Sequence, residues 1–338
     1  MRVGLTYDLR DDYRALGGFS EAALAEFDSP DTIAAIEAAL QANGCRVERI
    51  GHIRHLAARL VAGDGWDLVF NVAEGVAGRS REAQVPALLE AYGLPYVFSD
   101  PLTMAATLDK AVAKRLVRDA GLPTASFAVI ESDADALACD LTFPVFVKPL
   151  AEGTGKGCER ASKAANRRAL IAAARTLRAR FDQPAIAEPF LPGREFTVGI
   201  LGNGASARII AVLEILLLES AEPEVYSFEN KELCESRVEY RLVEDAEALA
   251  AGATALAAYR TLGCRDASRV DLRSDAAGVP QFLEVNPVAG LHPTHSDLPI
   301  LAQQSGMSYT QLIGEILQAA RQRYGLTQQQ TKRRRVTA

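Results

Sequence analysis

Polar and apolar residues alternate in two short stretches near the end of the chain, residues 268–273 and 281–286. Alternation with a period of two is typical of a strand with one buried face. Residues 274–278, Ser-Asp-Ala-Ala-Gly, have the composition of a turn, so the two stretches predict an antiparallel hairpin. The expected core-facing residues of this hairpin are Val270, Leu272, Leu283 and Val285.

The other face of the predicted hairpin is polar, because side chains two positions apart on a strand share a face. It carries Arg269, Asp271, Glu284 and Asn286. Hard divalent cations prefer oxygen ligands, and Mg²⁺ usually takes a few carboxylates together with phosphate oxygens. The hairpin alone therefore indicates either a site for Mg²⁺ and phosphate or a solvated face with charged residues.

The first hundred residues alternate between strand and helix patterns. Strands are predicted at 3–7, 47–50, 68–71 and 95–97, and helices at 31–43, 53–62 and 84–92. This order implies a parallel sheet with helices on its faces. Ligands bind beyond the carboxyl ends of the strands in such sheets, where two polar stretches lie, one containing Glu26 and one at 71–75.

The chain has 338 residues, more than one core usually organises, and its pattern changes after residue 100. The expected units are an N-terminal α/β domain (1–100), a central domain (101–190) and a C-terminal antiparallel-sheet domain (191–324). Residues 219–240 and 287–299 read as irregular segments. The basic tail, 325–338, is expected to be disordered.

Composition and charge argue against two classes of partner, nucleic acids and membranes. A net charge of -6 argues against nucleic acid, and no apolar run approaches the roughly 20 residues that a membrane span needs. The five cysteines are scattered and lack metal-ligand spacing, which favours a reducing, cytoplasmic setting. The expected partners are therefore small molecules.

Phosphate-binding chemistry is indicated by lysines beside a glycine-rich loop. Lys110 begins a predicted helix, and Lys148 ends a strand that otherwise reads as buried, where a charge needs a partner. In the loop at 152–157 the glycines alternate, so its N–H groups can approach an anion closely. The loop lacks the P-loop spacing and is a weak signal alone.

The run from Glu188 to Glu195 is a second candidate for ligand binding. An extended segment with a carboxylate, an aromatic ring and exposed backbone can accept adenine, and a second carboxylate seven residues later can hold ribose hydroxyls. A strand–turn–strand with surface acids is the alternative that this run leaves open by itself.

Taken together and in this order, the motifs resemble the ATP-grasp superfamily, and most closely the D-alanine–D-alanine ligases. The resemblance spans residues 1–324 and rests on Asp109-Lys110, Val147-Lys148-Pro149, the glycine loop, 188–195, Lys231, 269–271, 284–287 and 295–296. It implies the ATP-grasp fold, an α/β (α+β mixed) architecture, and an ATP-dependent carboxylate–amine ligase that forms a dipeptide-like bond through an acyl phosphate.

The resemblance also implies roles for individual residues. Lys110, Lys148 and Lys231 are expected to hold the ATP phosphates, Glu188 and Leu191 the adenine, and Glu195 the ribose. Asp271, Glu284 and Asn286 are the expected ligands of two Mg²⁺ ions, for which Mn²⁺ can substitute. Arg269 would steady the acyl phosphate; Thr154 and Ser296 would orient the second substrate, and Glu26 would hold the ammonium of the first. A homodimer is expected.

The chain departs from the ligase pattern mainly on the amino-acid side. Residues 74–81 read Glu-Gly-Val-Ala-Gly-Arg-Ser-Arg, Glu232 follows Lys231 where a tyrosine is usual, and the loop 290–296 is one residue longer. D-alanine is thus one candidate substrate among other amino acids, peptides and amines. Two alternatives stay open: a nucleotide-binding regulator without turnover, and an acyl-phosphate-forming ligase for an acid that is not an amino acid.

Overall fold

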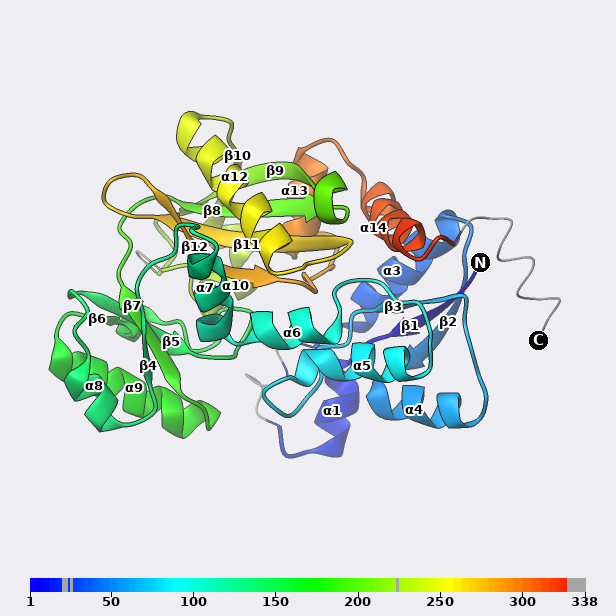
Figure 1. Cartoon of the computed structure of the whole chain (residues 1–338), viewed down its shortest axis with the longest axis horizontal. Coiled ribbons are helices and arrows are strands. Elements are labelled where there is room, and N and C mark those ends of the chain that lie inside the picture. The colour runs from blue at the N-terminus through cyan, green and yellow to red at the C-terminus, as the bar shows by residue number, and fades with distance from the viewer. Residues whose placement is uncertain (20–23, 25–26, 223–224, 327–338) are drawn as a thin grey trace.

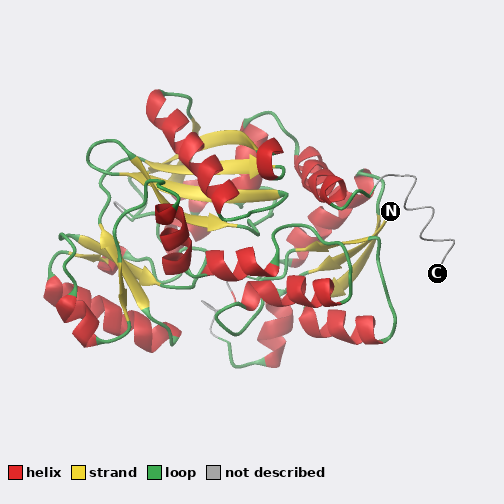
Figure 2. Cartoon of the chain, in the orientation of Figure 1, coloured by secondary structure: helices red, strands yellow, loops and turns green. Residues whose placement is uncertain are grey.

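The computed structural model describes residues 1–19, 24, 27–222 and 225–326, and it contains three separate β-sheets (Figures 1 and 2). Glu26 and most of the predicted basic tail lie outside the described residues. Within the described part of the chain, no helix is long and apolar enough to cross a membrane. The mixed α/β architecture expected from the sequence is confirmed.

The N-terminal sheet has three parallel strands in the order β2-β1-β3, as the strand–helix alternation predicts. The strands are β1 (Arg2–Thr6), β2 (Arg46–Gly51) and β3 (Leu68–Asn71), and the helices are α1 (Arg10–Leu16), α3 (Pro30–Ala42), α4 (Ile53–Val61) and α5 (Gln84–Ala91). A short 3-10 helix, Arg81–Ala83, precedes α5. The strand predicted at 95–97 is reduced to one bridge between Val69 and Tyr96.

The central sheet is antiparallel, in the order β4-β7-β5-β6, with its own apolar core beneath α9. Its elements are β4 (Ala128–Ile130), α8 (Asp133–Ala138), β5 (Val145–Pro149), β6 (Lys163–Ala164), α9 (Arg167–Phe181) and β7 (Ala185–Pro189). Two helices, α6 (Pro101–Leu108) and α7 (Lys110–Asp119), connect it to the N-terminal sheet (Figure 1). The sequence pattern did not predict α8. Ser132 and Asp135 form a capping box at its start.

The C-terminal sheet has five antiparallel strands in the order β10-β9-β8-β11-β12. Its elements are β8 (Glu195–Leu201), β9 (Arg208–Leu217), β10 (Val238–Leu242), α12 (Ala246–Thr261), β11 (Ala267–Ser274) and β12 (Pro280–Asn286). Helices α13 (Asp297–Gln304) and α14 (Tyr309–Arg323) follow. The segment predicted to be irregular contains α10 (Phe228–Glu232), α11 (Cys234–Arg237) and β10, and α13 begins inside the predicted loop 287–299.

The predicted hairpin forms, but a β-bulge changes which face one residue occupies. Asp271 pairs with Glu284 and Leu272 pairs with Phe282, so Leu283 has no partner across the ladder. The expectation that Leu283 faces the core is wrong: Phe282 is fully buried there, and Leu283 lines a cavity instead. A bulge inserts one extra residue and re-aims the side chains beside it, which strict alternation cannot anticipate.

The last helices connect the C-terminal sheet to the N-terminal one. α14 lies beside α3 (Figure 1), and Leu312, Ile313 and Ile316 share one apolar core with Val3 and Leu5 of β1. Val288, Ala289 and Leu291 of the loop after β12 belong to the same core, so this loop lies against the N-terminal sheet.

Candidate active site

Two adjoining cavities lie where the three sheets meet. The larger has a volume of about 420 Å³ and the smaller about 100 Å³. Five side chains line both: Lys110, Glu152, Tyr226, Lys231 and Glu284. All the predicted site residues within the described part of the chain lie on the walls of these two cavities, so the sequence motifs converge in space.

The smaller cavity lies between the central and the C-terminal sheets. Its walls carry the predicted nucleotide residues Lys148, Glu188, Leu191 and Glu195, with Leu283 beside them. β5 supplies Lys148 and β7 supplies Glu188, and these strands pair so that Lys148 lies opposite Ile186. The cavity is therefore partly apolar and partly charged, as a site for a base joined to phosphates must be.

A buried cluster of one acid and two lysines lies at the smaller cavity, where Glu188 and Lys148 line the wall and Lys114 lies behind them. Glu188 is 2.5 Å from Lys114 Nζ and 3.0 Å from Lys148 Nζ. Burial opposes the charge of Glu188, but the two lysines outweigh burial and keep its pKa below the ordinary value. Lys114 was not indicated by the sequence, although it lies one helical turn after Lys110 on α7 and so faces the same way.

The other acid of the smaller cavity is Glu195 at the start of β8. Arg273 of the neighbouring strand β11 lies 3.1 Å from its carboxylate. Burial raises the pKa of Glu195, and the positive charge of Arg273 opposes that rise. The ring of Phe190 lies between two cations, with Lys163 Nζ 4.0 Å and the Arg273 guanidinium carbon 5.0 Å from its centroid.

The polar face of the hairpin lies between the two cavities. Asp271 accepts hydrogen bonds from Thr197 Oγ1 (2.8 Å) and Asn286 Nδ2 (3.4 Å), and Arg269 lies 3.0 Å from it. Glu284 is directly across the ladder from Asp271 and is 3.2 Å from Lys110 Nζ. The predicted metal ligands are therefore neighbours on one face.

The charge state of Glu284 suits a cation site. Burial alone raises the pKa of Glu284, but the positive charges of Lys110 and Lys148 outweigh burial and hold the pKa well below its usual range. Within the described residues, no group of three His, Cys, Asp or Glu side chains is arranged to hold a metal ion. A divalent ion here would need the two carboxylates, the Asn286 amide and further oxygens such as those of a phosphate, which fits the preference of Mg²⁺.

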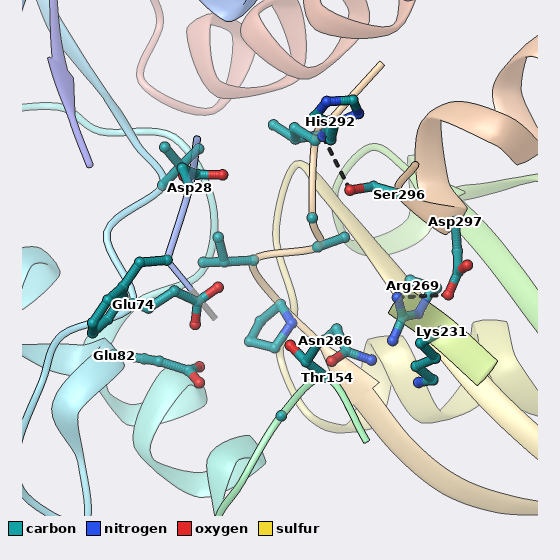
Figure 3. Close-up of a pocket in the computed structure, with 18 of the residues that line it drawn as sticks. Asp28, Glu74, Glu82, Thr154, Lys231, Arg269, Asn286, His292, Ser296 and Asp297 are labelled. Carbon is teal, nitrogen blue, oxygen red and sulfur yellow. Dashed lines mark hydrogen bonds and ion pairs between the residues drawn. The ribbon is translucent and has the colours of Figure 1, made fainter. Parts of the chain in front are cut away.

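The glycine-rich loop places a polar side chain in the larger cavity. Thr154 has a φ of +54°, a conformation that non-glycine residues adopt only when the surroundings hold them there. Lys110 donates to the backbone oxygen of Glu152, which fixes the loop against α7. Thr154 and Asn286 both line the larger cavity, so the loop and the end of β12 contribute to the same site (Figure 3).

The far wall of the larger cavity is acidic and comes from residues 28–82. Figure 3 shows Asp28, Glu74 and Glu82 on one side, opposite Arg269 and Lys231. Burial, with the negative charge of Asp8 nearby, raises the pKa of Asp28 to about 7. The sequence placed a candidate at Glu26, and the described structure places Asp28 of the same polar stretch on the wall.

The loop that leads into α13 closes the larger cavity. Ser296 Oγ accepts a hydrogen bond from the backbone N–H of His292 at 3.0 Å, which is drawn in Figure 3. The next residue, Asp297, lies 2.9 Å from Arg269 Nη1. Asp297 was not singled out in the sequence, because it lies in the stretch 287–299 that was predicted to be a loop.

A cavity between two antiparallel sheets, with lysines from β5, α7 and α10 and acids from a hairpin, is typical of the ATP-grasp fold. Solved structures support this fold: the D-alanine–D-alanine ligase of Bacillus anthracis complexed with ATP matches with a TM-score of 0.69 and 21% identity, covering 95% of this chain and 97% of that one. The VanG D-Ala:D-Ser ligase of Enterococcus faecalis matches with a TM-score of 0.71 and 20% identity, covering 95% and 99%.

Sequence comparison identifies the family. The family model for the D-ala D-ala ligase C-terminus matches residues 116–318. The D-alanine–D-alanine ligase of Cupriavidus necator is 35% identical, with 84% of each chain covered, and that of Gluconobacter oxydans is 39% identical, covering 73% of this chain and 78% of its own. The chain belongs to the D-alanine–D-alanine ligase family and is an ATP-dependent ligase of that type. An uncharacterised protein of Sinorhizobium fredii is 36% identical over 76% of this chain and 75% of its own.

Proposed function

We propose that the chain joins the carboxylate of one amino-acid-like substrate to the amine of another, with hydrolysis of ATP to ADP and phosphate. The observation that carries this proposal is the shared wall between the two cavities. Lys110, Lys231 and Glu284 line both, so a carboxylate in the larger cavity and a triphosphate reaching out of the smaller one meet at the same charged residues. Phosphoryl transfer depends chiefly on positioning and charge neutralisation, which this wall supplies.

The proposed nucleotide site is the smaller cavity. Leu283 and the backbone near Leu191 would contact adenine, and Glu195 would accept from the ribose hydroxyls. Lys148, held at the cavity wall by Glu188, would contact the phosphates together with Lys110 and Lys231. Glu188 is already paired with two lysines, so we propose that its side chain mainly positions Lys148.

Asp271, Glu284 and Asn286 would hold the proposed divalent ions, because their oxygen-rich chemistry and proximity fit Mg²⁺. When bound, such ions neutralise charge on the transferring phosphoryl group. Two further charges belong to side chains of the protein. Lys110 neutralises part of the charge of Glu284. Arg269 is paired with two carboxylates, and its guanidinium lines the larger cavity.

The proposed reaction has two steps. A substrate carboxylate oxygen attacks the γ-phosphorus of ATP, ADP leaves, and an acyl phosphate forms. The free amine of the second substrate then attacks the acyl carbon, the carbon–oxygen bond to phosphate breaks, and the amine loses a proton as the amide forms. Arg269 would stabilise the negative oxygen of the tetrahedral intermediate, while Thr154 and Ser296 would orient the amine-bearing substrate.

The experiment that tests this function is an ADP-release screen over pairs of D- and L-amino acids, with mass detection of the product. We expect ADP release to depend on both members of a pair and to match the amide formed. D-alanine with itself is the first pair, and absence of its dipeptide would remove that substrate alone. ATP turnover that no pair stimulates would count against the ligase proposal.

A matched pair of variants connects the screen to the proposed site. We expect Asp271→Asn to lower turnover by about 100-fold or more, because it removes the negative charge of a proposed metal ligand beside Glu284. Asp119→Asn, exposed at the end of α7, should leave turnover unchanged. Equal activity of the two variants would show that the hairpin face does not take part.

The cellular setting and assembly are also proposals. The five cysteines are free thiols in the described structure, which is consistent with the reducing cytoplasm that we propose. We propose a homodimer, as the resemblance implies. Light scattering at micromolar concentration would give twice the 36.3 kDa chain mass if this is correct.

A further inference from the structure

One buried carboxylate, Asp297, connects three elements around the larger cavity. Its Oδ2 lies 2.9 Å from Arg269 Nη1 on β11. Its Oδ1 accepts from Tyr240 of β10 at 3.0 Å and from Tyr226 at 3.2 Å, and the two hydroxyls lie 2.7 Å apart. Asp297 is only 6% exposed, so these contacts form largely out of water.

Tyr226 belongs to a stretch that covers both cavities, residues 225–237, which we call the cover segment. Tyr226 and Lys231 of this segment line the larger and the smaller cavity alike. The Lys231 ammonium lies 4.6 Å from the centroid of the Tyr226 ring, so the position of the ring also sets that of the lysine. The hydroxyl of Tyr226 contacts Asp297, which lies on a different element.

Arg269 is held from two sides. Asp271 accepts from its Nε and Nη2 at 3.1 and 3.0 Å, and Asp297 binds the remaining nitrogen, Nη1. The bidentate pair with Asp271 holds one edge of the guanidinium, and the contact with Asp297 holds the nitrogen outside that edge, which limits tilting of the group. Asp297 therefore sets the direction in which Arg269 faces the cavity.

The tyrosines are hydrogen-bond donors over the whole neutral range. Burial, followed by the negative charge of Asp297, raises the pKa of Tyr226 well above its ordinary value, and the same two causes raise the pKa of Tyr240. Both hydroxyls keep their protons, and because each has only one to donate, the two protons serve the contacts with Asp297 and the contact between the hydroxyls. The contact between the cover segment and Asp297 is thus a charge-assisted hydrogen bond, which is stronger than a neutral one.

We propose that Asp297 is a positioning residue that fixes the cover segment and Arg269 in one mutual arrangement, so that the reacting acyl group is shielded from water while it faces the guanidinium. This role rests on the proposed ligase function. An acyl phosphate that meets water is hydrolysed, and ATP is then consumed without amide formation. Loss of the arrangement should therefore raise the ratio of ADP released to amide formed.

Two substitutions separate the two sides of Asp297. Tyr226→Phe removes one hydroxyl from the cover segment and leaves the contact between Asp297 and Arg269. Asp297→Asn keeps the shape but places an amide, not a charge, beside the guanidinium. Tyr92→Phe is the matched control, since Tyr92 is 48% exposed and distant from both cavities.

The first measurement is hydrogen–deuterium exchange of the whole chain without ligands, which does not depend on any turnover. We expect backbone amides in 225–232 to exchange about tenfold faster in Tyr226→Phe and in Asp297→Asn than in wild type or Tyr92→Phe. Unchanged exchange in both variants would overturn the proposal even if the enzyme is a ligase.

The second measurement is the ratio of ADP to amide with the productive pair from the screen. We expect each variant to raise this ratio several-fold, and the double variant to differ from the sum of the two effects because both act through one carboxylate. Faster exchange with a wild-type ratio would overturn the shielding role. If the screen yields no amide at all, the ligase function fails, and the exchange data still decide whether Asp297 holds the cover segment.

Discussion

Lys114 shows how one buried side chain can organise a site without lining it. Its ammonium donates to Thr124 Oγ1 and to the backbone oxygen of Phe282, both at 2.9 Å, and contacts Glu188. These partners join α7 to β12 and to β7. By sharing the charge of Glu188 with Lys148, Lys114 leaves part of the charge of Lys148 for an anion in the cavity.

We predict that Lys114→Met lowers the free energy of unfolding by about 3 kcal/mol, because it leaves a buried carboxylate with one cation fewer. It should also raise the KM for ATP, since Glu188 then binds Lys148 more tightly. Urea unfolding and initial rates measure the two effects. Arg115→Met, exposed on the same helix, should change stability by less than about 0.5 kcal/mol, and an equal loss there would contradict the explanation.

The bulge in β12 works at the scale of an element. Two adjacent apolar side chains next to the bulge have different surroundings: Phe282 packs beneath α12, and Leu283 lines the smaller cavity. An ordinary strand would also place neighbours on opposite faces, but the extra residue brings Leu283 to the same cavity as Glu284.

We predict opposite phenotypes for truncation of these two residues. Phe282→Ala should cost about 3–5 kcal/mol of stability, since it empties a fully buried position. Leu283→Ala should cost far less stability and should weaken ATP binding, because it removes apolar contact area from the cavity. Thermal melts and calorimetric titration with ATP measure the pair; a stability loss in Leu283→Ala equal to that in Phe282→Ala would refute the assignment.

β2 contributes a charge cluster that makes stability depend on pH. Glu48 accepts from Arg2 of β1 at 2.8 Å and from Trp66 at 3.2 Å, and it also pairs with Arg59 of α4. The hydrogen bond from Arg59, followed by that from Arg2, lowers the pKa of Glu48 to about 2. A carboxyl with a lowered folded-state pKa stabilises the fold above its unfolded pKa, and this stabilisation is lost as the pH falls toward the folded pKa.

We predict that Glu48→Gln lowers stability by about 1 kcal/mol at pH 7, a modest value because Glu48 is partly exposed. The difference from wild type should stay constant down to about pH 4.5 and then shrink as the pH approaches 2. Melting temperatures at pH 7, 5 and 3 measure this, with the exposed Glu315→Gln as the control. A stability difference between Glu48→Gln and wild type that grows at low pH would contradict the lowered pKa of Glu48.

At the scale of the whole molecule, the two ends of the chain share a core and the middle has its own. Asp266 is fully buried; it accepts from the backbone N–H of Phe98 and contacts Arg323 of α14 at 2.6 Å. We propose that the chain has three domains, residues 1–100, 101–190 and 191–324. Ala113 and Val117 of α7, in the second domain, pack into the core of the third. The first and last units should open together, and the central sheet separately.

We predict that Leu312→Ala, in the shared core, speeds hydrogen exchange in both β1 and α14, with a stability loss of about 3 kcal/mol. Leu170→Ala, in the core of the central sheet, should speed exchange chiefly within residues 128–189. Native-state exchange with mass spectrometry measures both. Identical exchange patterns for the two variants would show that the chain opens as one unit.

Much of the fold could be predicted because local signals were strong. The Ser29–Pro30 start of α3, the glycine after it and the alternation in β11 each fix a boundary through cap or pleat geometry. Short helices such as α1, α8 and α13 have too few turns for a period to be visible, and the bulge at Leu283 depends on the partner strand. These features come from tertiary contacts.

Some residues of the candidate site could also be predicted from the sequence, and others could not. Lys148 and Glu284 could be selected because the order of short motifs resembled a known family, and their side chains do line adjoining cavities. Lys114, Asp28 and Asp297 were missed because each lies in an ordinary helix or loop context. Their importance depends on which buried charge they meet, and only the folded arrangement shows that.

The wall that the two cavities have in common ties their occupants together thermodynamically. A nucleotide that shifts Lys231 or Tyr226 changes the surroundings of the amino acid, and the reverse holds equally. Linkage requires the two effects to be the same size: if ATP tightens the hold on an amino acid about tenfold, the amino acid tightens the hold on ATP about tenfold. With such positive coupling, affinities measured for either partner alone understate those that operate when both are present.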